Sequence, residues 1–582
     1  MIPPISPRST ILWSFVLFFT TALAFTPSED SDPVSYVTLP KHRIIKWNIT
    51  HYDRQSLAPG YWFVAPYWVT VGEPYTTRWM PYQIGPQIFD QDGELVWTGV
   101  EFTDNQNAFD LRVVDSSDKP QLSVMVQTGI GLDLENANGT VLDDHYQVVG
   151  SVPVNDKHEF FVYAPGRALA IHHRREVVDL AEIGLPGVSR LVKFQGFQDI
   201  DYTTGEVLFE WDSEGNISLG ETYRSVEAGP PEDAADYVHA NSIEKTTDGD
   251  YLLSCRHTNT IYSISGQDGS ILWRLGGKKN SFEKDFIFSK QHDARIISMT
   301  SEHMVMSFLD NGADELSSDE TVSSAMIVEL DLVAYTATLL NRYPRPDGDV
   351  TSRRGSTQLL PNNNVFVSWS DYGYISEFDH DGRLLLEARF VSDRFGNYRA
   401  YKYPWTAQPA EPPALVASVS GTSSSDLTTE FHVSWNGATE VKSWRFRARA
   451  NATSDDVEIG VTPKTGFETT FVAKGYMDWV SVEAVNTNSE TLAISPIIRS
   501  SSPKYWPNGD MPGTDDPAAL LAPIVHESHP ANLLVIGIFA LILAIGSICW
   551  LCTGLFRHRG RRSYARVLEG EGEPMLESRN SV

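Results

Sequence analysis

Residues 236–295 hold the pattern that decides the fold. The stretch begins Asp236-Tyr-Val-His239-Ala-Asn241-Ser-Ile243, continues Tyr251-Leu-Leu-Ser-Cys-Arg256 and Ile264-Ser-Gly-Gln-Asp-Gly269-Ser-Ile-Leu-Trp273, and closes Ser289-Lys-Gln-His292-Asp293-Ala-Arg295. Each polar cluster adjoins a short apolar run of β-prone residues, so the pattern predicts His, Asn and Arg side chains where strands begin or end. In β-rich proteins these positions commonly carry function.

The segment around Gly269 has counterparts elsewhere in the chain. Each one is an apolar run, an Asp/Gly turn and a second apolar run, which is typical of a β-hairpin. The turn glycines are Gly93, Gly205, Gly269 and Gly382, spaced by 112, 64 and 113 residues. Two gaps are nearly double the third, so a fainter copy is expected in each long gap, and residues 329–340 are a candidate for one.

A unit of roughly 50 to 60 residues with about four short strands indicates a β-propeller more than a β-sandwich. Residues 60–405 have room for about six such units, which makes an all-β, six-bladed propeller the predicted fold. The preceding residues 25–59 are expected to be irregular.

Three segments share a plan in which a histidine precedes an apolar run, a turn and a second apolar run. They start at His158, His239 and His292, and a fourth segment with the same plan starts at Gly355 without a histidine. If these are equivalent strands of a repeat, symmetry places the three histidines around one axis. Arg256 ends the antiparallel return from the strand that His239 opens, so it is expected at the same face.

The C-terminal part of the chain has a different pattern. Residues 406–415 are a proline-rich linker by composition. Residues 416–500 alternate short strands with turns at sandwich spacing and resemble a fibronectin type III or immunoglobulin-like domain. A stalk rich in Pro, Asp and Ser is expected over residues 501–531.

Composition limits the class of partner. The 582 residues are 41% hydrophobic, and 75 acidic against 46 basic residues give a formal net charge of −29. That charge repels phosphates, so no nucleic-acid partner is expected. Cys255 is the only cysteine before residue 549, so stability is expected to come from a large core and not from disulfides.

Both ends of the chain carry targeting patterns. Residues 1–24 have the basic, apolar and small-residue regions of a signal peptide. Residues 532–556 are long and apolar enough for one transmembrane helix, and the arginines that follow place the tail, 557–582, in the cytoplasm. The sequence therefore predicts a single-pass type I membrane protein of the plasma membrane or an endomembrane, with glycosylation sequons at Asn48, Asn138, Asn216 and Asn451.

The segments around His239-Ala-Asn241, Arg256 and Gln291-His292-Asp293 resemble the active-site segments of the arylsulfotransferase family, which moves a sulfuryl group between phenols without a nucleotide donor. Further similarity to the fungal, membrane-anchored branch lies in 60–67, 85–90, 156–160, 197–201 and 377–382. This resemblance implies that His292 is the nucleophile, forming a transient sulfohistidine with His239 and Arg256 as its catalytic partners. It also implies that His158 and Asn241 bind the substrate, a small phenol or aryl sulfate, and that no cofactor is needed.

The chemistry of these residue types agrees with that implication. A neutral imidazole is nucleophilic near pH 7, and arginine offers a permanent charge with a fork of donors for an oxyanion. The pair His172-His173 does not indicate a metal, because neighbouring strand residues point to opposite faces. No metal site is predicted.

Two alternatives remain open from the sequence. The propeller could be a non-catalytic cell-surface domain that binds an anionic or phenolic ligand. It could also be a hydrolase or isomerase that processes phenolic metabolites without sulfuryl transfer, using His239 as acid or base.

Overall fold

The computed structural model describes residues 33–68, 82–114, 119–128, 135–230, 232–423, 426–451 and 453–502. Within these ranges the fold is built from β-strands, and its helices are four 3-10 turns: η1 (Arg54–Ser56), η2 (Ala181–Ile183), η3 (Leu219–Glu221) and η4 (Asp371–Gly373). The predicted signal peptide, transmembrane helix and tail lie outside the described residues, as does the stalk beyond residue 502. No helix of the described segments is long and apolar enough to span a lipid bilayer.

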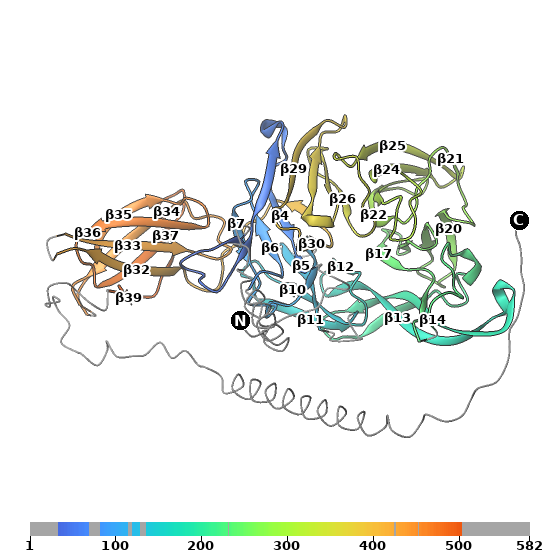
Figure 1. Ribbon diagram of the computed structural model, residues 1–582, viewed down its shortest axis with the longest axis horizontal. Helices are drawn as coiled ribbons and strands as arrows, with labels where there is room; N and C mark the ends of the chain where they lie inside the picture. The colour runs from blue at the N-terminus through green and yellow to red at the C-terminus, as the bar shows by residue number, and fades with distance from the viewer. Residues whose placement is uncertain are drawn as a thin grey trace, which may run out of the picture. The chain divides into compact units, whose positions relative to one another are not determined.

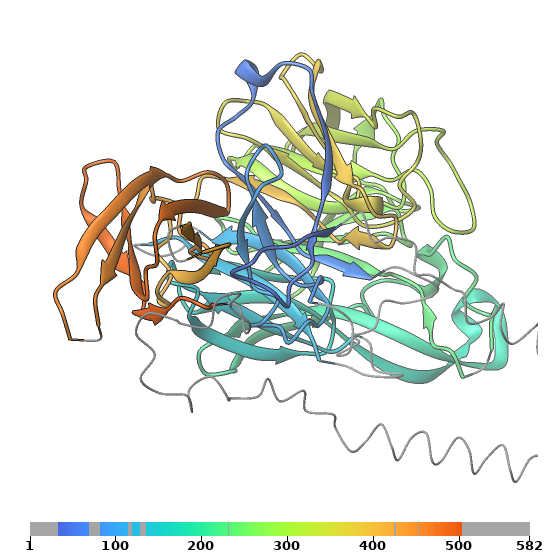
Figure 2. The same ribbon diagram turned by 60° about the vertical axis from the view of Figure 1, so that its left-hand side comes forward.

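The described chain up to residue 403 forms six successive sheets, each built on a run of four antiparallel strands (Figures 1 and 2). Sheet 1 has the order β31 (Tyr401–Tyr403), β4 (Tyr61–Val64), β6 (Gln87–Phe89), β7 (Leu95–Thr98). Sheet 2 consists of β8 (Ala108–Val114), β9 (Gln121–Gln127), β10 (Ala137–Leu142) and β11 (Val148–Val154). Sheet 3 consists of β12 (Phe160–Ala164), β13 (Arg167–Leu180), β14 (Leu185–Asp201) and β15 (Val207–Asp212), with β16 (Ala235–Asp236) added to β14.

The remaining three sheets repeat this order. Sheet 4 consists of β17 (Ala240–Lys245), β18 (Tyr251–Cys255), β19 (Thr260–Ile264) and β20 (Ile271–Gly276). Sheet 5 consists of β22 (His292–Met299), β23 (His303–Asp310), β24 (Ser324–Asp331) and β25 (Thr336–Pro344), with β21 (Glu283–Lys284) added to β25. Sheet 6 consists of β26 (Ser356–Leu359), β27 (Val365–Ser368), β28 (Ile375–Phe378) and β29 (Leu384–Phe390). This arrangement is all-β and consistent with the predicted six-bladed propeller.

Strands distant in sequence complete the first and last sheets. β31 pairs with β4 in sheet 1, and β3 (Trp47–His51) pairs with β29 in sheet 6. Two short pairs lie beside them, β1 (Pro33–Val34) with β2 (Ile44–Ile45) and β5 (Pro66–Trp68) with β30 (Phe395–Asn397). In sheets 1 and 6, a strand from one end of the repeat region therefore pairs with a strand from the other end. This pairing covers strand edges that would otherwise stay unpaired.

The hairpin repeat read from the sequence is confirmed. Gly93, Gly205, Gly269 and Gly382 all have φ between +74° and +87° and all connect the third and fourth strands of their sheets, in sheets 1, 3, 4 and 6. The two long gaps correspond to sheets 2 and 5, and residues 329–340 are the hairpin of sheet 5. Neighbouring sheets also meet at these turns, since Trp211 of β15 donates from Nε1 to the carbonyl of Gly269 at 2.8 Å.

A sandwich follows the propeller-like part. One sheet has the order β32 (Ala414–Gly421), β33 (Leu427–Ser434), β36 (Glu468–Lys474), and the other β35 (Val457–Pro463), β34 (Ser443–Arg449), β37 (Trp479–Val485), β38 (Thr491–Ile494), with β39 (Ile498–Arg499) on β37. Phe431, Trp444 and Phe446 fill the core between them. Asn436 hydrogen-bonds both the N–H and the carbonyl of Thr98, at 2.8 and 2.9 Å.

The predicted linker packs against both parts it connects. Ala407 is buried, its N–H donates to Thr439 Oγ1 at 3.0 Å, and the N–H of Gln408 donates to the carbonyl of Asp144 at 3.2 Å. The predicted domain boundaries themselves stay predictions.

Candidate functional site

A cavity of about 390 Å³ lies where the innermost strands of the six sheets begin. Each sheet contributes one residue within three positions of the start of that strand, and all six line the cavity: Tyr398 (sheet 1), Phe109 (sheet 2), His158 (sheet 3), His239 (sheet 4), His292 (sheet 5) and Arg354 (sheet 6). The expectation that three histidines of different repeats face one cavity is therefore confirmed by the geometry. Arg256, predicted at the same face as His239, also lines the cavity, and its backbone N–H donates to the backbone carbonyl of His239 at 3.0 Å.

His292 is held rigidly in one tautomer. Its Nδ1 lies 2.7 Å from Asn311 Oδ1 and 3.1 Å from the carbonyl of Lys290. The Nδ2 of Asn311 donates to two backbone carbonyls, so its Oδ1 must be an acceptor and His292 Nδ1 must carry the hydrogen. The lone pair is then on Nε2, which accepts the backbone N–H of Arg354 at 3.1 Å.

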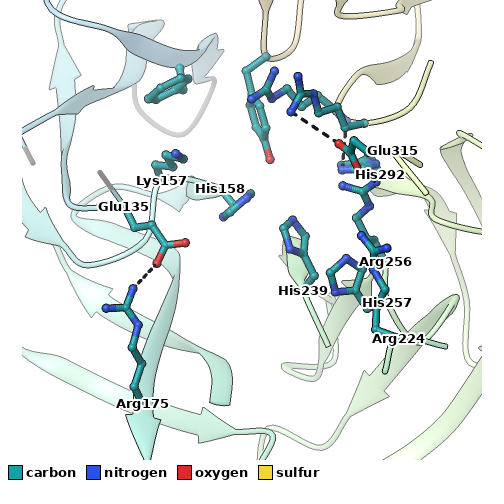
Figure 3. Close-up of a pocket in the computed structure, with 14 residues that line it drawn as sticks. Glu135, Lys157, His158, Arg175, Arg224, His239, Arg256, His257, His292 and Glu315 are labelled. Atoms are coloured by element: carbon teal, nitrogen blue, oxygen red, sulfur yellow. Dashed lines mark hydrogen bonds and ion pairs between the residues drawn. The ribbon is translucent and has the colours of Figure 1, made fainter. Parts of the chain in front are cut away.

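His239 and His158 are each backed by a carboxylate. Nδ1 of His239 lies 2.7 Å from Asp236 Oδ2, and Nδ1 of His158 lies 2.6 Å from Asp156 Oδ1. Anionic acceptors on Nδ1 fix the hydrogen there and leave the Nε2 lone pair available for proton transfer. The two rings lie edge to face with centroids 4.9 Å apart, side by side in Figure 3.

Burial keeps three histidines of this cavity, His239, His257 and His292, neutral. It lowers the pKa of His239 to about 3, against the opposing effect of Asp236, and the pKa of His257 to about 4. Burial, followed by the charge of Arg256, lowers the pKa of His292 well below its usual range. At neutral pH these imidazoles are therefore bases and nucleophiles, not cations.

Arginine donors surround the histidines. Arg256 donates from Nη2 to the carbonyl of Ser352 at 2.7 Å and lies 3.6 Å from Glu315. Glu315 also lies 3.6 Å from Arg353. The Nε atoms of Arg256 and Arg353 are buried and have no hydrogen-bond partner among the described residues. Both arginines line the cavity, where the permanent charge of a guanidinium group suits an oxyanion.

Asn241 does not line this cavity. Its Nδ2 donates to the carbonyl of Gln291 at 2.8 Å, which ties sheet 4 to the residue before His292. The backbone carbonyl of Asn241 accepts a hydrogen bond from Nη2 of Arg399. The structure therefore places Asn241 in the wall behind the histidines, where it positions His292; the substrate-binding role implied by the family resemblance stays a prediction.

A buried network of charged side chains lies next to the residues that line the cavity. Three carboxylates meet three guanidinium groups there: Asp110, Glu159 and Asp293 with Arg112, Arg295 and Arg399. Four members of this network each stand one position after a cavity residue. Asp110 follows Phe109, Glu159 follows His158, Asp293 follows His292 and Arg399 follows Tyr398. One layer of residues therefore faces the ligand space, and the next locks the sheets together.

The sequence analysis missed several cavity residues. They are Phe109, Glu135, Lys157, Arg175, Arg224, His257, Glu315, Arg353, Arg354 and Tyr398. The segment that starts at Gly355 has the same plan as the three histidine segments. It marks the start of a strand in sheet 6 and so could have pointed to Arg354, the residue before it. His257 follows Arg256 directly, but nothing in the pattern separated it from an ordinary strand end.

The predicted glycosylation sites occupy different environments. Asn48, Asn216 and Asn451 are exposed, whereas Asn138 is half-buried on β10. His172 and His173 do point apart: His172 Nε2 lies 3.3 Å from the carbonyl of Trp211, and His173 Nε2 lies 3.3 Å from Glu135.

Comparisons with known proteins support one family. Residues 140–391 match the family model described as Arylsulfotransferase (ASST), which confirms the resemblance read from the sequence. No curated protein gives a significant match to the chain.

Three solved structures show distant similarity. A protein of unknown function from Bacteroides caccae has 12% identity, covers 59% of this chain and 99% of its own, and has a TM-score of 0.31. The GH43 BlXynB protein from Bacillus licheniformis has 8% identity, 68% and 88% coverage and a TM-score of 0.28. Apo AztD from Citrobacter koseri has 9% identity, 59% and 99% coverage and a TM-score of 0.27. These scores are too low to bear on fold or function.

Proposed function

We propose, from the premise that residues 140–391 belong to the arylsulfotransferase family, that this protein transfers a sulfuryl group between phenolic compounds through a sulfohistidine at His292. The observation that carries the proposal is that His292, His239 and Arg256 line one cavity, together with further arginines such as Arg353. A neutral nucleophile, a neutral base and an oxyanion site are the three parts that such a transfer needs.

In the first half of the reaction, Nε2 of His292 gives up the N–H of Arg354 and attacks the sulfur of an aryl sulfate. The N–S bond forms while the bond from sulfur to the aryl oxygen breaks, and a phenolate leaves. The guanidinium groups of Arg256 and Arg353, which line the cavity, stabilise the negative charge that the transition state spreads over the sulfuryl oxygens. Phe109 and Tyr398 provide aromatic surface for the phenol ring.

In the second half, an acceptor phenol gives its proton to Nε2 of His239 and its oxygen takes the sulfuryl group, which restores His292. Asp236 stabilises the imidazolium that forms, from 2.7 Å. The proton then passes to the next leaving phenolate, so the cycle neither gains nor loses a proton. His158, with Asp156 behind it, lies close enough to His239 to share this role.

The test is a covalent adduct. Full-length protein is mixed with 4-nitrophenyl sulfate and no acceptor, digested and analysed by mass spectrometry. We expect sulfuryl mass on the peptide that contains His292, and none in His292→Ala. A matched variant, His303→Ala, removes a half-exposed histidine of the same sheet and should keep the adduct. An adduct that persists in folded His292→Ala contradicts the proposal.

One observation favours a second function. The Nε2 lone pair of His292 already accepts the N–H of Arg354, which favours a cavity that binds an anion without nucleophilic attack by His292. If the protein binds aryl sulfates saturably but neither His292 nor any other residue is modified, it is a non-catalytic binding propeller.

For the location, we propose a type I anchor with the propeller and sandwich outside the cytoplasm. The support is the sequence pattern of the two ends and the exposure of Asn48, Asn216 and Asn451. A mobility shift on endoglycosidase treatment, lost when all four sequon asparagines are changed to Gln, is the expected result. An unchanged mobility of the wild type on treatment counts against this location.

A further inference from the structure

We propose that Asp236, His239 and His257 form a binding site for a divalent transition metal ion in the wall of the cavity. One ligand atom from each of the three residues lies within 4.8 Å of the other two. The donor set is two imidazoles and one carboxylate, a combination that suits Zn²⁺ and its neighbours in the first transition row.

The geometry is close to that of a bound ion. Nδ1 of His239 lies 2.7 Å and Nδ1 of His257 lies 3.9 Å from oxygens of the Asp236 carboxylate. The two rings have centroids 4.7 Å apart. Ligand atoms that share a zinc ion at about 2.0–2.2 Å lie roughly 3 to 3.5 Å from one another. Movements of less than about 1 Å in these side chains therefore bring three ligands to one ion.

Charges of both signs surround this place, because Arg224 and Arg256 line the same cavity as His239 and His257. Asp236 lies near two further buried or half-buried carboxylates, Asp156 and Glu135, and Lys193 is the ammonium between them. Lys193 is 2.7 Å from Glu135 but 4.0 Å from Asp236.

The rings need only a tautomer change to bind the ion. In the structure, Nδ1 of His239 donates to the Asp236 carboxylate and Nδ1 of His257 to the backbone carbonyl of Asp236, each at 2.7 Å. When the ion takes these positions, each neutral ring keeps one proton and carries it on Nε2. No proton or electron is lost, and the remaining coordination positions are filled by water or by an anion from the cavity.

This inference does not rest on the proposed sulfuryl transfer, but it interacts with it. A metal-bound His239 has its proton on Nε2 and can no longer accept one from a phenol there. Zn²⁺ is therefore expected to inhibit transfer, and a chelator to restore it. Metal binding is measured without any aryl sulfate and the His292 adduct without any metal, so the failure of either idea is visible separately.

The experiment titrates Zn²⁺ into chelator-treated full-length protein by calorimetry, with Mg²⁺ as the hard cation that this donor set does not suit. We expect one Zn²⁺ site with a Kd in the micromolar range or below, and no Mg²⁺ binding. Asp236→Asn and His257→Gln should each weaken the site at least tenfold. His303→Gln, on the surface of sheet 5, and His292→Ala, in the same cavity, should leave it within about twofold.

Melting temperatures without metal show whether each variant is folded. If Asp236→Asn is unfolded, the test rests on His257→Gln alone. Zn²⁺ affinity that is the same in folded His257→Gln as in the wild type overturns the proposal. So does a wild-type protein that binds no Zn²⁺. Binding that is lost in His257→Gln and kept in His303→Gln supports it.

Discussion

The backbone N–H of Arg354 donates to Nε2 of His292 across 62 positions of sequence, at 3.1 Å. This contact joins the starts of the innermost strands of sheets 5 and 6. It identifies Nε2 as the nitrogen that holds the lone pair of the imidazole, and it also defines which hydrogen bond must break before His292 can attack. The segment 352–355 is therefore part of the site, although only Gly355 in it showed a sequence pattern.

Arg256→Lys should lower sulfuryl transfer by about 10- to 100-fold while the protein stays folded, because losing one transition-state hydrogen bond typically costs about 1.4–3 kcal/mol. Lysine keeps the charge but cannot reproduce the planar fork of donors that the guanidinium group offers. Steady-state kinetics and melting temperature are the measurements. Arg499→Lys, an exposed pair with Asp478 in the sandwich, is the matched control. Equal activity in Arg256→Lys and wild type would show that the fork is not used.

Gly355→Ala should destabilise the protein and also reduce transfer. Gly355 has φ +97°, and an added Cβ would lie 2.3 Å from Leu309 Cδ2 and 2.6 Å from the carbonyl oxygen of Ser368. Gly348 also has positive φ (+74°) but has nothing within 4 Å of an added Cβ. We expect a loss of about 1 kcal/mol for Gly348→Ala and of more than about 2 kcal/mol for Gly355→Ala in denaturant unfolding. Equal losses would mean that the loop yields without strain.

Glu159→Gln should be among the most destabilising substitutions in the protein. Glu159 is fully buried and pairs with Arg112, Arg295 and Arg399. Removing its charge leaves three buried guanidinium groups with two carboxylates, and breaking one partner of a buried ionic network costs about 3–5 kcal/mol. Glu210→Gln, an exposed residue that bonds Gln198, is the control and should change stability by less than about 0.5 kcal/mol. Chemical denaturation of both variants decides between these values.

Stability should fall as the pH is lowered from 7 toward 4. The pKa values of His239, His257 and His292 are depressed in the folded protein, to about 3 and about 4 for the first two, whereas an unfolded histidine titrates near 6.5. Below about 6.5 the unfolded chain binds protons that the folded chain does not, so the folded state loses up to about 1.4 kcal/mol per pH unit for each such group.

This pH dependence is checked by urea unfolding at pH 7, 6 and 5. His257→Gln should show a shallower fall than the wild type, because one of the groups is gone. A wild-type stability that is constant or rises toward pH 5 would show that these histidines are protonated in the folded protein.

Much of the architecture was determined by the sequence alone. The Asp/Gly turns at Gly93, Gly205, Gly269 and Gly382 require positive φ, and the apolar runs around them can form only short paired strands. Their spacing predicted four-stranded units and even the two weaker copies. The histidines at strand starts followed from the same repeat, because equivalent positions of a cyclic repeat share one face.

The tertiary structure decided which residues act together. Asn241 has the same local pattern as a cavity residue, yet its side chain bonds Gln291 and its carbonyl accepts from Arg399. His257 gave no signal, yet it lies against His239 and Asp236. Local patterns fix the strand and the face on which a side chain lies. The approach of neighbouring sheets, set by packing between residues some 50 positions apart, fixes the ångström distances on which proton transfer, anion binding and metal ligation depend.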